Sequence, residues 1–183
     1  MLYVFGFERV GVAVSDLYFV DPKPDVGQEG AERGVRLEVR LLERPPLEGS
    51  IYAAQPIAVD RPIWRADLLE AAAGPPGTFD RTHHHPRFRG WEPGRRQFEE
   101  ALSAEPVEWV GERLADLDGL LAGAGVDPAE VDPDDAAQLR AAVPEILASV
   151  RTLLERIHAG ELAVAPSDAP PDSPVDSVRR SWL

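Results

Sequence analysis

The sequence predicts an α+β fold, in which an antiparallel β-sheet from the N-terminal half is covered by a C-terminal helical hairpin. Two observations carry this prediction. Apolar residues recur with a period of two in much of the first half of the chain, and with spacings of three and four further on. The 183 residues are enough for one domain of ordinary size. We therefore expect a single domain over 1–162, with the sheet in 1–90 and the helices in 97–160.

The first strands of this sheet are indicated by apolar and β-branched runs. Leu2–Val14 is such a run, and Asp16–Val20 continues it after a turn. Asp21–Gly34 is rich in proline, glycine and charge, which is typical of a loop. Val35–Leu41 alternates apolar and charged residues, so it predicts a strand with one face in the core and the other in water.

The remaining strands follow a proline-rich turn at 45–49. Ser50–Val59 is predicted to return as the second strand of an antiparallel hairpin, and Asp60–Pro62 to end it. Ile63–Ala72 fits either a strand or a helix, and its position among strands favours a strand. Thr82–Phe88 is expected to be the last strand.

The helical half begins with a single apolar stripe. Residues 107, 110, 114, 117 and 121 predict one amphipathic helix that begins at Pro106 and ends near Gly123. A second stripe over 139–157 predicts a second helix, which Pro144 should kink or divide. The segment 163–183 is rich in proline, aspartate and serine, so we expect a disordered tail.

Charge and composition exclude several classes of protein. The formal net charge is −13, and the excess lies in 99–172, where 17 acidic residues face 4 basic ones. Such a surface repels the phosphate backbone of nucleic acids, so we do not expect a nucleic-acid partner. No apolar run reaches the roughly 20 residues that span a bilayer, and no cysteine is present to form disulfides or thiolate metal sites. We expect a cytoplasmic protein without a membrane segment.

The segment whose residues best suit metal binding or catalysis contains three consecutive histidines at 83–85. On a strand, His83 and His85 point to the same face, so two imidazoles can bind one metal ion. Carboxylates would complete such a site, and two histidines with one carboxylate suit Zn, Fe(II) or Mn. No spaced metal-binding signature is present, so we expect that the protein binds no cofactor. Binding of Zn, Fe(II) or Mn at His83 and His85 is the alternative. The candidate metal ligands are His83, His85, Asp67, Asp80 and Glu92.

Arginines and aromatic residues follow the same histidines in the sequence, and a second group of such residues lies near the end of the chain. Guanidinium groups beside rings can bind an anion or a partner. We favour the alternative that the arginines near the histidines pair with the acidic helices. In the tail, Trp182 beside two arginines could anchor a peptide in a partner protein. The candidate residues are Arg87, Arg89, Trp91, Arg95, Arg96, Arg179, Arg180 and Trp182.

Three runs carry a resemblance to known proteins: Pro56–Leu69, Thr82–Pro86 and Gly90–Pro93. Together they resemble a group of uncharacterised actinobacterial proteins, a resemblance that covers most of the chain outside the tail and implies no activity. The strand followed by a histidine-rich segment is also similar to small toxin–antitoxin proteins of the TumE type. Neither resemblance assigns a role to a residue.

Two hypotheses about function follow. The first is a non-enzymatic protein-interaction module, which binds a protein partner or a second copy of itself through its acidic helices and its tail. The second is a metal- or histidine-dependent enzyme, similar to a hydrolase, centred on residues 83–85. The first is favoured, because no two of the enzymatic features support each other.

Overall fold

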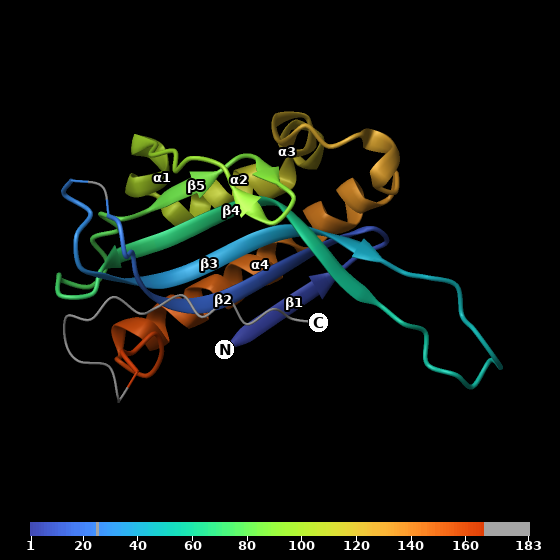
Figure 1. The fold of residues 1–183 in the computed structure, drawn as a ribbon, viewed down its shortest axis with the longest axis horizontal. Coiled ribbons are helices and arrows are strands. Elements are labelled where there is room, and N and C mark those ends of the chain that lie inside the picture. Colours follow the sequence, from blue (N-terminus) through green and yellow to red (C-terminus); the bar gives the residue numbers. More distant parts are fainter. Residues whose placement is uncertain (25, 167–183) are drawn as a thin grey trace.

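A computed structural model describes residues 1–24 and 26–166. Its main element is a five-stranded antiparallel sheet in the order β1-β2-β3-β4-β5, so each strand pairs with the next one along the chain. The helices lie on one face of this sheet (Figure 1). The predicted α+β class, with the sheet before the helices, is therefore confirmed. The five strands are β1 (Leu2–Gly6), β2 (Val10–Val20), β3 (Ala31–Glu43), β4 (Ala58–Ala71) and β5 (His83–His85).

The strand boundaries correct the sequence-based ones in the first apolar run, in the connection after β3 and at Pro62. The first apolar run is divided into β1 and β2 by a tight turn, in which Phe7 N–H donates to the carbonyl of Val10. Most of the predicted strand Ser50–Val59 is a long connection, and β4 begins only at Ala58. Pro62 does not end a strand but lies within β4, where the register against β3 shifts. Such an irregularity accommodates a proline that cannot donate to the ladder. Residues 63–71 are strand, as favoured.

A second, two-stranded sheet follows β5. It consists of β6 (Phe88–Arg89) and β7 (Glu92–Pro93), which form a hairpin. This hairpin lies against the face of the main sheet that the helices leave open, because the Arg65 guanidinium on β4 stacks on the Phe88 ring at 5.1 Å. The predicted strand Thr82–Phe88 is thus divided between β5 and β6.

The helical half contains more elements than a simple hairpin. Asp116 separates α2 from α3, and its side chain accepts a hydrogen bond from Gly119 N–H at the start of α3. α4 continues through Pro144 without division. Pro144 is exposed, so the carbonyl that it leaves without a donor can bond to water. The elements are α1 (Glu100–Ala104), α2 (Pro106–Ala115), α3 (Leu117–Ala124), a 3₁₀ turn at Pro128–Glu130 and α4 (Asp135–His158).

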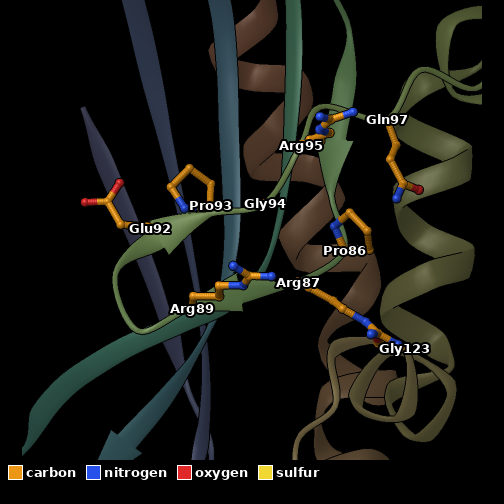
Figure 2. Close-up of a pocket in the computed structure, with 9 residues that line it drawn as sticks. All are labelled: Pro86, Arg87, Arg89, Glu92, Pro93, Gly94, Arg95, Gln97 and Gly123. Atoms are coloured by element: carbon orange, nitrogen blue, oxygen red, sulfur yellow. The ribbon is translucent and has the colours of Figure 1, made fainter.

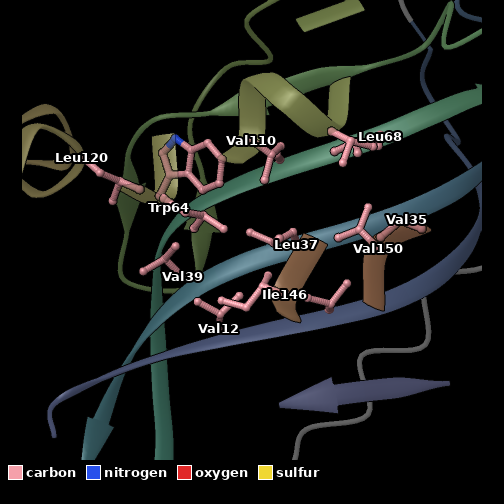
Figure 3. Close-up of a cluster of buried hydrophobic side chains, with 14 of the residues drawn as sticks. Val12, Val35, Leu37, Val39, Trp64, Leu68, Val110, Leu120, Ile146 and Val150 are labelled. Carbon is pink, nitrogen blue, oxygen red and sulfur yellow. The ribbon is translucent and has the colours of Figure 1, made fainter. Parts of the chain in front are cut away.

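The hydrophobic core lies between the sheet and the two longest helices, α2 and α4 (Figure 3). The apolar residues that alternate on β3, such as Leu37, meet Val110 of α2 and Ile146 of α4 in this layer. All three side chains are inaccessible to water. Burial of apolar side chains on this scale stabilises the fold and positions the opposite, polar face of the sheet. No helix among the described residues is long and apolar enough to cross a membrane.

Candidate metal centre

The side chains of Asp67, His83 and His85 meet on the polar face of the sheet. Asp67 lies opposite His83 in the register of β4 and β5, and His85 projects from the same face two residues further on. Asp67 Oδ2 lies 3.4 Å from His83 Nε2 and 3.6 Å from His85 Nε2. One potential ligand atom of each residue lies within 4.8 Å of the other two. All three residues are buried, with exposures of 1%, 1% and 6%.

The other ring nitrogen of each histidine contacts a backbone carbonyl. His83 Nδ1 lies 2.8 Å from the oxygen of Arg81, and His85 Nδ1 lies 2.7 Å from that of Gly94. A carbonyl oxygen only accepts hydrogen bonds, so both Nδ1 atoms carry hydrogen. In neutral rings both Nε2 atoms then present lone pairs to the Asp67 carboxylate. This is the arrangement that metal-binding histidines commonly adopt.

Arg36 supports the carboxylate from the neighbouring strand. Its Nε donates to Asp67 Oδ1 at 2.7 Å and its Nη2 donates to Oδ2 at 3.2 Å. Burial alone would raise the pKa of Asp67. The charge of Arg36 and its hydrogen bonds to the carboxylate outweigh burial and hold the pKa of Asp67 well below its usual range. Asp67 is therefore an anion that faces two imidazole nitrogens.

When both histidines are neutral, the lone pairs of their Nε2 atoms face the negative charge of the Asp67 carboxylate. This arrangement is unfavourable unless a cation lies between the three groups. A protonated imidazole can supply one, and a divalent metal ion bound by both Nε2 atoms and by Oδ2 can supply it better, because it satisfies all three at once. Two histidines and one carboxylate suit Zn, Fe(II) or Mn, and they leave coordination positions open for water or substrate. The donor set present thus fits the ions that the sequence indicates as the alternative to a protein without a cofactor.

A cavity of about 290 Å³ adjoins this cluster. Asp67 and both histidines line it, which gives a small molecule access to the open side of the cluster. At its wall lies Glu32, which is buried and whose Oε2 has no hydrogen-bond partner among the described residues. The other lining residues are Phe19, Arg36, Arg65, Leu69, Pro93 and Arg96.

The two remaining candidate carboxylates lie outside the cluster. Asp80 accepts hydrogen bonds from Ala71 N–H and from the Thr78 hydroxyl. Glu92 lies on β7 and is exposed. The structure therefore brings only Asp67, of the three carboxylates considered, to His83 and His85.

Sequence reasoning did not single out Arg36. The alternation over Val35–Leu41 predicted a charged face in water, but Glu38 on that face is only 8% exposed. It pairs with Arg65 of β4 at 2.6 Å, just as Arg36 pairs with Asp67. Alternating charges of opposite sign on both strands were the available signal for this pairing.

His84, the middle histidine, points to the opposite face of the sheet. Its ring lies 5.0 Å from the Trp109 ring in an edge-to-face arrangement. Burial lowers the pKa of His84, and the nearby Glu99 carboxylate, at 2.9 Å, opposes that shift. The three consecutive histidines are thus divided between two faces, two for the metal cluster and one for the core side.

The arginines near the histidines are also divided. Arg96 pairs with Asp21 and with the buried Glu32, which are residues of the sheet region and not of the acidic helices. Arg87, Arg89 and Arg95 have no carboxylate within 4.0 Å among the described residues. The favoured expectation that these arginines are neutralised by the helices is therefore wrong for all four. Trp91 is exposed and stacks on Arg40, whereas Arg179, Arg180 and Trp182 lie outside the described residues.

Comparisons of the chain with family models, with curated proteins and with solved structures gave no match. The resemblances to the actinobacterial group and to TumE-type proteins therefore stay predictions.

Proposed function

We propose that this protein is a metal-dependent hydrolase, which binds a divalent transition-metal ion through Asp67, His83 and His85. The observation that carries the proposal is the pair of histidines whose Nδ1 atoms are committed to the carbonyls of Arg81 and Gly94, which leaves both Nε2 atoms facing one ionised carboxylate. A metal ion is the cation that this donor set accommodates best.

The reaction class follows from the open side of the cluster. Three protein ligands leave room for water, and a bound divalent metal acidifies water enough to supply a nucleophile near neutral pH. The adjoining cavity of about 290 Å³ has room for a small substrate beside the metal. Glu32, with its free Oε2, is the group in that cavity suited to accept a proton.

Elemental analysis tests the metal directly. The protein is purified without a histidine tag, because a tag would imitate the native cluster, and is incubated with Zn²⁺, Fe²⁺ or Mn²⁺ before dialysis. We expect about one ion per chain in the wild type. His83→Ala and His85→Ala should lose it, and a His158→Gln control should keep it, because His158 lies outside the cluster.

The hydrolase assignment has its own readout. The metal-loaded wild type should hydrolyse activated esters or phosphoesters, and His85→Ala should not. Failure of every chain to retain metal would contradict the whole proposal. Metal retained at the cluster without any hydrolysis of these substrates would leave a metal centre and contradict the enzymatic part.

A second proposal, the protein-interaction module, is favoured by a different feature. The connection between β3 and β4 projects from the body of the protein (Figure 1). It carries apolar side chains that water reaches almost fully, such as Ile51 at 83% and Tyr52 at 91% exposure. Exposed apolar groups gathered on one projection are typical of a surface that a partner covers.

Light scattering and pull-down experiments test this second proposal. Self-association through the projection predicts a dimer that the double variant Ile51→Ser, Tyr52→Ser converts to a monomer. Binding of another protein predicts a captured partner that the double variant loses. If the wild type and the double variant are both monomers and neither captures a partner, this projection is not the binding surface of an interaction module.

A further inference from the structure

A groove of about 870 Å³ lies beside the β6–β7 hairpin and shares only Pro93 with the cavity beside the metal cluster. The β6–β7 hairpin forms one side of it, and Gly123 of α3 lies at the other (Figure 2). Three arginines line it: Arg87, Arg89 and Arg95. A groove of this volume is in the range of small-molecule sites.

The charge of this groove is unusual for the chain. The protein as a whole has a formal net charge of −13, yet three guanidinium groups gather here and none has a carboxylate within 4.0 Å among the described residues. Glu92 is the acidic residue of the lining, and its side chain points away from Arg87 and Arg95 (Figure 2). The groove is therefore a local positive region in an acidic protein.

The positions of the arginines suit a bound anion. Arg87 Nε donates to the carbonyl of Gly123 at 2.6 Å, which anchors this guanidinium and leaves its terminal N–H groups available. Gln97 adds a neutral amide to the same lining. The three guanidinium groups repel one another while the groove is empty. A multiply charged anion that accepts hydrogen bonds from several of them would offset this electrostatic repulsion.

The surroundings limit how large that anion can be. The groove borders α3, in the region 99–172 that carries 17 acidic residues against 4 basic ones. A long polyanion that left the groove in this direction would meet repulsion. A second cavity of about 290 Å³ shares Pro86 and Gly123 with the groove and is lined by Trp64, so it offers an aromatic wall for the organic part of a small ligand.

We propose that the groove binds a small phosphorylated molecule, with its phosphoryl groups on Arg87, Arg89 and Arg95 and its organic part toward Trp64. This site does not depend on the proposed metal centre, since none of these residues belongs to the cluster of Asp67, His83 and His85.

Titration calorimetry with inorganic pyrophosphate and with adenosine diphosphate tests the site. We expect saturable binding by the wild type that weakens as salt is added. The double variant Arg89→Gln, Arg95→Gln should bind at least about tenfold more weakly, because the loss of even one charge-assisted contact costs about that factor. Binding should persist in the presence of EDTA, which separates this site from the metal centre.

The matched control is Arg140→Gln. Arg140 is exposed and donates to the carbonyl of Ala115 at 3.1 Å, as Arg87 does to Gly123, but it lies outside the groove. Its loss changes the net charge of the protein without touching the site, so binding should stay as in the wild type. All the substituted side chains lie at the surface, and circular dichroism checks that the variants fold.

Three results would overturn the proposal. The first is absence of binding to both probes at millimolar concentration. The second is equal weakening in the groove variant and in Arg140→Gln, which would mean a general charge effect. The third is a preference for oxalate or for a single-stranded oligonucleotide over pyrophosphate, which would assign the groove to carboxylates or to nucleic acid.

Discussion

Arg36 and Asp67 lie opposite each other in the register of β3 and β4, and the guanidinium of Arg36 contacts both oxygens of the Asp67 carboxylate. Asp67 is only 1% exposed, so Arg36 is the fixed cation that keeps this buried carboxylate ionised. The same carboxylate faces His83 and His85. A metal ion in the cluster would therefore share Asp67 with Arg36.

Replacement of Arg36 by methionine tests this relationship. The variant leaves a buried carboxylate without its cation, so the metal-free protein should lose about 3–5 kcal/mol of unfolding free energy. Added Zn²⁺ supplies a new cation and should raise the melting temperature of Arg36→Met more than that of the wild type. Thermal unfolding with and without Zn²⁺ measures both values, and an equal response of the two chains would contradict the shared role of Asp67.

Asp135, at the start of α4, ties that helix to the first turn of the sheet. Its Oδ1 accepts hydrogen bonds from the backbone N–H groups of Glu8 and Arg9 at 2.9 and 3.1 Å, and its Oδ2 accepts one from Asp132 at 2.8 Å. Asp135→Ala leaves these donors without a partner, so we expect a loss of about 3 kcal/mol or more in urea unfolding. The exposed neighbour Asp134 is the control. If Asp134→Ala costs as much, the effect belongs to the charge at the helix start and not to these contacts.

Gly34 is required where β3 passes β4. Its φ is +154°, and a Cβ at this position would lie 2.0 Å from the carbonyl oxygen of Leu68. Gly34→Ala should therefore destabilise the protein by more than about 3 kcal/mol, or prevent folding, because backbone must move. Gly123→Ala, a helical position with no atom near the new methyl group, should instead be neutral or stabilise by up to about 1 kcal/mol. Comparable losses in the two variants would contradict the steric explanation.

Asp16 predicts a pH dependence of stability. Burial opposes its ionisation, but hydrogen bonds from the amino-terminal ammonium group and from Ala163 N–H outweigh burial and lower the pKa of Asp16 below 3.8. A lowered pKa in the folded state stabilises the protein above the pKa of the unfolded chain, and this contribution is lost as the pH falls through the lowered value. Asp16→Asn should thus cost about 1 kcal/mol near pH 7 and progressively less on acidification toward pH 3. Urea unfolding at several pH values measures the difference, which should not stay constant.

Much of the candidate site follows from local sequence. Strand geometry alone places His83 and His85 on one face and His84 on the other, and the three alternating charges of β3 indicate a polar strand face. What local sequence does not contain is the partner across the ladder. Asp67, Asp80 and Glu92 were equal candidates by distance along the chain, and only the register of β4 against β5 selects Asp67.

The sequence by itself determined the order of sheet and helices, because hydrophobic periodicity is a property of neighbouring residues. The same local signals misplaced the start of β4 and ended a strand at Pro62, since pairing with β3 overrides the local preference there. The tertiary structure alone decided that the charged face of β3 is buried beneath the β6–β7 hairpin, and that Arg87, Arg89 and Arg95 meet in a groove beside α3. Both depend on contacts between residues far apart in the chain, and no pattern within one segment encodes such a contact.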